Sequence, residues 1–552
     1  MPRVGRVKLD LIIKNANVLT LNDERPQARA VGVWNGRIVG LDDDISELPA
    51  ARIVDAAGAT VTPGFHDVHN HMAAFGQQLQ EIDASGFTSA DQLYDAVAAA
   101  AAAEPGREWI TGSGYDQTRI GGHPVRTKLD AASGGRKVMF IHRTSHMLVA
   151  STAVFEAVGA LSPSFPVPSG GLIERDGDGS PTGLVAEQAM TAFRDLRKPF
   201  SEADLIQALG LAGDRYLAEG LTSVAEAGIG ASPLVGSSPV ELAAYQAGHE
   251  AGRIRLRTQL MVAMENFHSV VTAAADDYHL GLDLGIRTGL GDDRLSVGPL
   301  KVFTDGALMS RTASMTENFC GHDHAGVMQF GPEELRDLTV QAHRGGWQLA
   351  VHAIGDHAVD VALDVIEAAL SSRHRPDPRH RIEHASVVRP DQLERFVALG
   401  IIPSPQGRFV YEIGDGVAEV IGEQRLPWTY RHRSFLDAGL VVPGGSDRPV
   451  VQGAPLPAMQ AMVERRTSSG RAFNLHEGVS ALEALKSYTV DSAYASREEH
   501  SKGRIRERFH ADLVLLDQDP TAVPTEQIGA TLVLATLVGG VAEHDPQGIF
   551  AG

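Results

Sequence analysis

Cysteine is nearly absent from this chain of 552 residues, which carries only Cys320. A single cysteine excludes an internal disulfide and any zinc module built from several thiolates. Long apolar runs are missing as well, since no stretch approaches the roughly 20 apolar residues that a membrane helix needs. The first residues, MPRVGRVKLD, lack the apolar core of a secretory signal. We therefore expect a cytoplasmic protein without a membrane segment.

Positive charge is also scarce in this chain. Its 49 lysines and arginines face 69 acidic residues, which gives a formal net charge of -20. Such an excess argues against nucleic acid or an anionic membrane as a partner, so a small molecule is the expected one. Apolar residues make up 43% and charged residues 21%, as in an ordinary globular protein. The length exceeds that of one compact core and predicts two or more domains.

The two ends of the chain share short β-like runs separated by turn residues. LDLIIKNANVLT begins at Leu9, and ADLVLLDQDP and ATLVLATLVGGVAEH follow after residue 500. Neither end has enough strands for a core of its own, because an isolated hairpin is only marginally stable. We predict one small composite β-sandwich built from residues 1–62 and 500–552.

Residues 63–499 alternate strand-like and helix-like segments, which is typical of parallel βαβ construction in an α/β fold. Eight apolar runs can be counted, from TVTPGFHDVHNH to LVVPGGSDRP, and eight parallel strands close a (β/α)8, or TIM, barrel. The segment between the first two runs is far longer than one barrel repeat requires. It predicts an inserted subdomain at about residues 85–205, on the catalytic face of the barrel, where it would roof the site.

Six side chains of types that serve at metal centres lie at the ends of these runs: His69, His71, Lys301, His352, His384 and Asp447. They are far apart in sequence but share one local context, which indicates strand ends that converge on one site at the carboxyl face of a barrel. His69 and His71 are two residues apart on a strand, so both imidazoles should project from the same face.

Each of these residues also has a simpler explanation when it is taken alone. An HxH pair can be incidental, a lone histidine at a strand end is usually a hydrogen-bonded structural residue, and Gly-Ser-Asp most often forms a turn or a helix cap. Lys301 leaves two alternatives open, because a protonated ammonium cannot bind a metal. It is either a deprotonated lysine that takes up carbon dioxide to form a metal-bridging carbamate, or a lysine that pairs with Asp305 or caps the barrel.

The motifs PGFHDVHNH, KVFTDG, HAIGD, RIEH and GSDRP, in this order, resemble the amidohydrolase superfamily, and more narrowly its branch with N-substituted formamide deformylase. The resemblance extends over nearly the whole chain. It implies a homodimer with a binuclear centre, usually of zinc. The implied ligands of one ion are His69, His71 and Asp447, and those of the other are His352 and His384. Carboxylated Lys301 and a hydroxide would bridge the ions, and Asp447 would carry a proton from this hydroxide to the departing amine.

The activity implied is hydrolysis of a non-peptide C–N amide bond, in an N-substituted formamide or an N-acyl amine, with the bridging hydroxide as nucleophile. The alternatives are a cyclic amide or imide hydrolase, an aminohydrolase that releases ammonia, and a non-catalytic barrel with a regulatory role. Lys301 disfavours the aminohydrolase, because deaminating relatives commonly manage with one metal and no bridging lysine.

Candidate substrate contacts are His146 and Arg311. His146 follows Ser145 where relatives often show Gly-His, and its alternative is a structural hydrogen bond. Arg311 could bind a carbonyl or carboxylate, or it could pair with Asp305. Further residues expected on the catalytic face, with loop packing as their alternative, are Tyr115, Gln117, Met309 and Phe409. Candidates for orienting the ligands, with solvated loop carboxylates as the alternative, are Asp67, Asp305 and Asp356.

Overall fold

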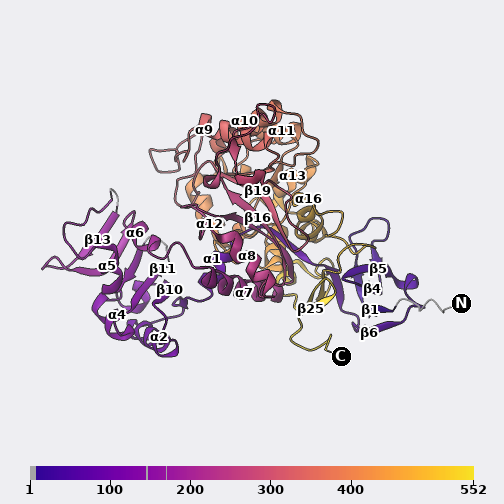
Figure 1. Cartoon of the computed structure of the whole chain (residues 1–552), viewed down its shortest axis with the longest axis horizontal. Coiled ribbons are helices and arrows are strands. Elements are labelled where there is room, and N and C mark those ends of the chain that lie inside the picture. The colour runs from indigo at the N-terminus through magenta and orange to yellow at the C-terminus, as the bar shows by residue number, and fades with distance from the viewer. Residues whose placement is uncertain (1–7, 144–146, 169–170, 552) are drawn as a thin grey trace. The chain divides into compact units, whose positions relative to one another are not determined.

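The computed structural model describes residues 8–143, 147–168 and 171–551 (Figure 1). The chain forms two compact units, one from residues 1–72 and 209–552 and the other from residues 73–208. In the described ranges no helix is long and apolar enough to cross a membrane.

A curved sheet of seven parallel strands is the centre of the first unit. Its order is β8 (Phe65–Asn70), β15 (Leu221–Ile229), β16 (Arg257–Ala263), β19 (Leu295–Phe303), β20 (Leu349–Ala353), β21 (Arg381–His384) and β22 (Ile402–Ser404). The strands alternate with helices that include α8 (Glu241–Glu250), α9 (Pro332–Arg344), α10 (Asp356–Ser372) and α11 (Pro390–Leu399). Nearly all of the strand residues are buried, as in a parallel sheet covered on both faces. The predicted α/β barrel is confirmed as this nearly closed sheet.

The eighth predicted run, LVVPGGSDRP, is not a strand, so the prediction of eight regular strands was wrong at this element. Pro443 has no N–H for a ladder. The N–H of Gly444 donates to the carbonyl of Ser487 (2.9 Å), in the π-helical turn Ser487–Asp491, and the N–H of Asp447 donates to the carbonyl of His69 (2.6 Å). The segment therefore lies beside β8, held by single hydrogen bonds where a ladder would otherwise run.

Strands from both ends of the chain share one sheet of six. Its order is β25 (Val541–His544), β24 (Val533–Val538), β23 (Leu513–Leu516), β7 (Thr60–Pro63), β2 (Asn17–Leu19) and β3 (Gln27–Ala28). A second sheet has the order β5 (Arg37–Leu41), β4 (Val31–Trp34), β1 (Leu9–Lys14) and β6 (Ala50–Asp55). Val33, Val61 and Leu513 belong to one apolar core that combines side chains from both sheets. These terminal strands fall in the same compact unit as the barrel.

A buried ion pair connects the barrel to the six-stranded sheet. Nε and Nη2 of Arg257, on β16, donate to the two carboxylate oxygens of Asp512 (2.7 and 3.0 Å), which directly precedes β23. Asp512 also accepts the N–H of Gly539 (2.8 Å). Burial opposes ionisation of this carboxyl, but Arg257 outweighs it and lowers the pKa of Asp512. The bidentate geometry compensates two charges that are both removed from water.

The second unit is built on a mixed sheet of six strands. Its order is β13 (Gly171–Arg175), β14 (Pro181–Glu187), β12 (Met147–Ala150), β11 (Lys137–His142), β10 (Trp109–Tyr115) and β9 (Ile82–Asp83). Its helices include α2 (Ala90–Ala103), α4 (Arg126–Ser133), α5 (Thr152–Val158) and α6 (Met190–Asp195). The segment predicted as an insertion, at about residues 85–205, falls within this unit.

The two ends of this unit touch each other. The chain enters it through α1 (Met72–Gln78) and leaves it through α7 (Glu202–Ala218). A Cβ atom on Gly76, in α1, would lie 1.9 Å from the carbonyl oxygen of Ala208, in α7. The two backbones are therefore in direct contact at a position where only glycine fits.

We expect Asp512→Asn to destabilise the protein by about 3 kcal/mol, because the buried guanidinium of Arg257 loses its buried bidentate partner and keeps only the half-exposed carboxylate of Asp293. Thermal unfolding followed by circular dichroism should show a lower midpoint at neutral pH. The difference should shrink as the pH falls, because the lowered pKa means that Asp512 stabilises the fold above its unfolded value of about 3.9 and loses this effect below it. Asp364→Asn, which removes one of the two exposed acidic partners of Arg395, is the control and should change the midpoint little. Equal midpoints for both variants would contradict the role of the buried pair.

Candidate metal centre

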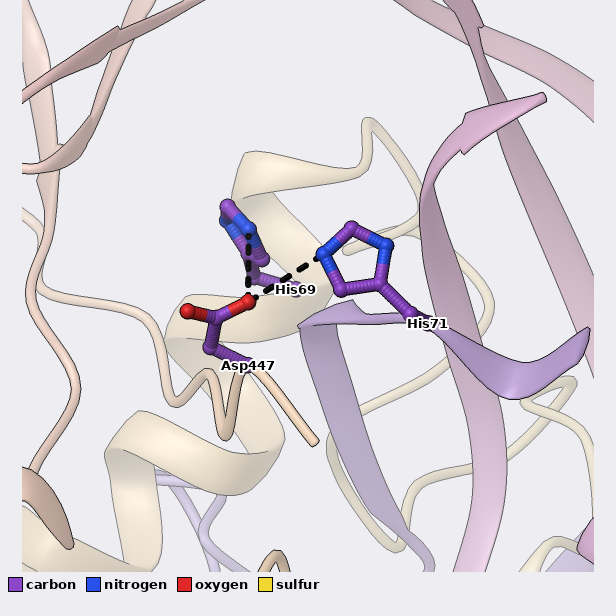
Figure 2. Close-up of side chains that lie close together, drawn as sticks. All are labelled: His69, His71 and Asp447. Atoms are coloured by element: carbon purple, nitrogen blue, oxygen red, sulfur yellow. Dashed lines mark ion pairs between the residues drawn. The ribbon is translucent and has the colours of Figure 1, made fainter. Parts of the chain in front are cut away.

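His69, His71 and Asp447 form a compact cluster of possible metal ligands (Figure 2). One ligand atom from each lies within 4.8 Å of the other two. Oδ1 of Asp447 is 3.2 Å from Nε2 of His71 and 3.6 Å from Nε2 of His69. The two histidines share a face because they are two residues apart at the end of β8. Asp447 reaches them because its segment is bonded to the backbone of His69.

The other three predicted ligand residues border the same cavity, which has a volume of about 300 Å³. The ring centre of His384 lies 4.8 Å from that of His69 and 4.5 Å from that of His352. Nζ of Lys301 lies 3.4 Å from Nε2 of His69. Lys301, His352 and His384 belong to the neighbouring strands β19, β20 and β21. The structure thus brings all six residues to one place at the carboxyl ends of the barrel strands.

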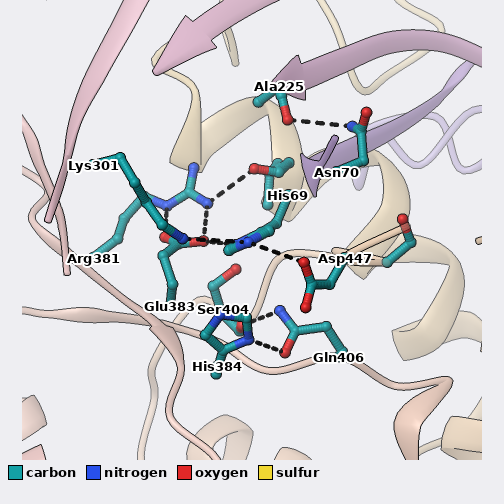
Figure 3. A network of polar contacts seen from close by, with 12 residues as sticks. His69, Asn70, Ala225, Lys301, Arg381, Glu383, His384, Ser404, Gln406 and Asp447 are labelled. Atoms are coloured by element: carbon teal, nitrogen blue, oxygen red, sulfur yellow. Dashed lines mark hydrogen bonds and ion pairs between the residues drawn. The ribbon is translucent and has the colours of Figure 1, made fainter. Parts of the chain in front are cut away.

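Three of the four histidines are held in place through Nδ1, and Figure 3 shows the contacts of two of them, His69 and His384. Nδ1 of His69 contacts Glu383, Nδ1 of His71 lies 3.4 Å from Oε1 of Glu226, and Nδ1 of His384 lies 2.8 Å from Oε1 of Gln406. An acceptor at Nδ1 fixes the ring and leaves Nε2 as the coordinating atom, which is the usual arrangement around metal-binding histidines. Imidazole and carboxylate donors oriented in this way fit a divalent cation such as zinc.

A fully buried Arg–Glu pair lies behind His69. Nε and Nη2 of Arg381 donate to the two oxygens of Glu383 (2.7 and 2.9 Å), and Nη2 also donates to the carbonyl of Val68 (3.1 Å). Glu383 in turn contacts the imidazole of His69. Sequence reasoning missed this role. The available signal was the spacing in RIEH, because residues two apart on a strand share a face.

Two of the six residues have a left-handed backbone. The φ angle is 69° at His384 and 57° at Asp447. For a residue other than glycine this conformation costs roughly 1–2 kcal/mol, and such strain collects at functional sites. At the end of β21 the left-handed conformation of His384 changes the direction of its side chain. In an extended strand Glu383 and His384 would point to opposite faces, but the left-handed turn lets both consecutive side chains serve the site.

Asp67 and Asp305 are buried and hold the backbone around the site. Asp67 accepts the N–H groups of His69 (3.1 Å) and Ser446 (3.0 Å), which ties β8 to the segment that carries Asp447. Asp305 accepts the N–H groups of Ile354 (3.1 Å) and Gly355 (2.9 Å) in the loop that follows β20. The alternative of solvated carboxylates is therefore wrong for these two residues.

His352 differs from the other three histidines in its contacts, and Asp356 differs from Asp67 and Asp305. Nε2 of His352 lies 3.0 Å from the carbonyl oxygen of Gly306 and 3.3 Å from Oδ1 of Asp305, so Nδ1 is its unengaged nitrogen. Asp356 begins α10, where it accepts the N–H of Thr316 (3.0 Å). Among the described residues, no ion pair joins Lys301 to Asp305, so the structure does not show that alternative for the lysine.

Only some of the residues predicted to contact the substrate lie at the cavity. Arg311 does not border the cavity, and within the described ranges its Nε is buried without a hydrogen-bond partner. His146 lies outside the described residues. Met309 and Phe409 do line the cavity. Tyr115 and Gln117 belong to the unit of residues 73–208. In this unit the hydroxyl of Tyr115 forms a hydrogen bond with Nδ1 of His123.

The electrostatics around His71 favour positive charge. Burial disfavours the charged imidazole of His71, but Asp447 and Glu226 outweigh it and raise the pKa of His71 to about 9. Burial also opposes ionisation of Asp447, but its hydrogen bond with His71 and the surrounding histidines hold its pKa well below the usual range. At Lys301, burial lowers the pKa to about 8. A site whose carboxylates draw a proton onto His71 provides the negative field that a bound cation requires.

The barrel and this cluster define a metal-dependent hydrolase. Residues 52–542 match the family model described as amidohydrolase family, and the chain belongs to that family. It is therefore a hydrolase of carbon–nitrogen bonds other than peptide bonds. It is 30% identical to an N-substituted formamide deformylase of Arthrobacter pascens, over 98% of this chain and 99% of that protein. The putative amidohydrolase YtcJ of Bacillus subtilis is 29% identical, over 95% of this chain and 97% of that protein.

The fold is also similar to a solved structure. An uncharacterized metal-dependent hydrolase from Pyrococcus horikoshii superposes with a TM-score of 0.76 at 26% sequence identity. The alignment covers 94% of this chain and 99% of that one. The likeness therefore extends well beyond the strands that carry the six ligand-type residues.

We expect Glu226→Gln to weaken binding of a divalent metal by about 10- to 100-fold, because the carboxylate beside Nδ1 of His71 becomes an uncharged amide that orients the ring less firmly. A competition titration between the protein and a zinc chelator would measure the change. Glu250→Gln, an exposed substitution at the end of α8, serves as the control and should leave the affinity unchanged. An unaltered affinity in Glu226→Gln would show that His71 is not held for metal binding.

Proposed function

We propose that this protein hydrolyses the amide bond of an N-substituted formamide or an N-acyl amine. The observation that carries the proposal is the gathering of four histidines, Asp447 and a buried lysine around one cavity. The similarity to an N-substituted formamide deformylase over the whole length supports the choice of amide. The substrate is a small molecule, and a homodimer is part of the same proposal.

Two divalent ions, of zinc in our proposal, suit the donors present. His69, His71 and Asp447 would hold one ion, and His352 and His384 would hold the other. When bound, such ions supply a nucleophilic water at neutral pH and polarise the carbonyl of the substrate. The contacts at Nδ1 of His69, His71 and His384, which leave Nε2 of each ring as the coordinating atom, support this chemistry.

Lys301 is the proposed bridging residue, in a carboxylated form. Its amine is buried beside His69, and in the described part of the chain no carboxylate forms an ion pair with it. Addition of carbon dioxide to the neutral amine forms a bond from Nζ to carbon and releases one proton. Together with the proton that the ammonium loses first, two protons leave as the cationic side chain becomes an anionic carbamate with two oxygens. Such an anion would suit the position between the two groups of histidines.

Asp447 is the proposed proton carrier. Its carboxylate borders the cavity and lies within 3.6 Å of both imidazoles of the first cluster. In the reaction it would accept a proton from the attacking water and deliver it to the nitrogen of the departing amine as the C–N bond breaks. The products are a carboxylic acid, which is formate for a formamide, and a free amine. Asp67 and Ser446 hold the backbone that positions this carboxylate.

A hydrolysis screen on the zinc-loaded protein tests the proposed reaction. The panel should contain N-alkylformamides, N-acetylamines, cyclic amides and amino-substituted heterocycles, with separate assays for released amine and released ammonia. We expect amine from the formamides or acetylamines and no ammonia. Ammonia release would instead indicate an aminohydrolase, and ring opening without a free amine would indicate a cyclic amidase. The absence of all turnover would contradict the proposal.

Lys301→Ala tests the proposed bridge. We expect the bound metal to fall from two ions per chain to one, and the rate of hydrolysis to fall by at least about 100-fold, because the anion between the ions is lost. After exchange with ¹³C-bicarbonate, the wild type should show a carbamate signal in its ¹³C spectrum that Lys301→Ala lacks. Lys14→Ala, at an exposed lysine, should behave like the wild type. Two ions and full activity in Lys301→Ala would rule out the bridge.

A further inference from the structure

The cavity that contains the metal ligands has an uncharged second half. Apart from the six ligand-type residues, none of the described residues that line it carries a charge. Ser386 and Tyr430, with their hydroxyl groups, are the only other polar residues among the described ones on its walls. Most of the wall consists of aliphatic and aromatic side chains, among them Val235, Phe303, Phe409 and Ile413. A ligand next to the metal site therefore meets apolar surface.

The apolar walls are set by close packing. Phe409 and Ile413 lie four residues apart on α12 (Phe409–Ile421), so they share one face of the helix. A Cβ atom on Gly416, in the same helix, would lie 2.4 Å from the methyl carbon of Met309, which lines the cavity. A Cβ atom on Gly228 would lie 2.4 Å from a methyl group of Val235, at a φ of 147°. Both wall residues occupy space that only a glycine leaves open.

The apolar surface continues to the outside of the barrel unit. Leu234, Met309 and Val450 line the cavity and also rank among its exposed large apolar side chains, with exposed fractions of 44%, 46% and 60%. A path from solvent to the ligand cluster thus runs along apolar groups. A charged substituent would lose its hydration there without gaining a partner, which is unfavourable by several kcal/mol for a carboxylate.

We propose that this chamber, defined by Val235, Phe303, Met309, Phe409 and Ile413, binds an uncharged apolar substituent of the substrate and rejects acidic ones. The inference rests on the proposed function and adds the substrate class to it. At roughly 30 Å³ for each atom, a cavity of about 300 Å³ holds about ten non-hydrogen atoms. The amide group uses some of them, which leaves space for a chain or ring of about six carbons. N-acyl amino acids, whose carboxylate would lie against these walls, are excluded as a class.

Two formamides of matched chain length test this selectivity on the zinc-loaded full chain. N-hexylformamide carries an apolar chain, and 6-formamidohexanoate carries a carboxylate on a chain of the same carbon number. We expect kcat/KM to be at least about 100-fold lower for the carboxylate, because its charge is desolvated without compensation. The methyl ester of the acid, which has no charge, should react like the hexyl compound. Comparable values for the acid and its ester would overturn the inference and leave the proposed amidase function standing.

Binding separates the two proposals if hydrolysis fails. If neither formamide is turned over, the proposed function fails, but isothermal titration of the zinc-loaded protein with the same compounds still tests the chamber. Tighter binding of the hexyl compound than of the acid would support the inference. Equal binding, or tighter binding of the acid, would overturn it.

A change of charge in the wall provides the second test. Ile413→Lys places a cation on a half-buried position of α12. We expect the preference between the hexyl compound and the acid to shift by at least about tenfold toward the acid, because the carboxylate gains a partner. Val397→Lys, at a 47% exposed position of α11, makes the same change in charge away from the cavity and should leave the preference unchanged. Circular dichroism would verify that both variants are folded, and an unshifted preference in Ile413→Lys would contradict the placement of the substituent.

Discussion

A few hydrogen bonds between β8 and the segment around Asp447 hold together the candidate ligand cluster of His69, His71 and Asp447. The carbonyl of His69 accepts the N–H of Asp447, and the carboxylate of Asp67 accepts the N–H groups of His69 and Ser446. These bonds connect the first barrel strand to the last barrel segment, where a regular ladder is missing. Closure of the barrel and assembly of the first ligand cluster are therefore one event, because the same backbone groups do both.

The barrel could be predicted because its strands are short apolar runs with similar endings. The same feature made His69, Lys301, His352 and His384 visible as a set, since each ends such a run. The supporting residues could not be found in this way. Glu226 and Glu383 occupy ordinary strand positions, and only the folded barrel shows that their carboxylates face Nδ1 of His71 and His69.

The irregular parts were beyond sequence reasoning for a different physical reason. A run such as LVVPGGSDRP has the composition of a strand, but its conformation depends on a partner far away in the chain, the π-helical turn that contains Ser487. The left-handed backbone at His384 and Asp447 could not be predicted either, because residues other than glycine adopt it uncommonly, although His and Asp do so more often than most. Local propensity disfavours these conformations, and tertiary contacts around the cavity impose them.

The contact between Gly76 and Ala208 bears on how such a barrel can change over evolutionary time. Because the chain leaves for residues 73–208 and returns at adjoining points, the barrel has to bridge almost no gap there. A segment of this kind can be lengthened, shortened or exchanged as a cassette while the metal-bearing strands keep their spacing. Glycine at position 76 is required for this close approach, because any side chain there would push the two helices apart. Descendants of one ancestral barrel could thus acquire new inserted segments while the strands that carry the metal ligands stay unchanged.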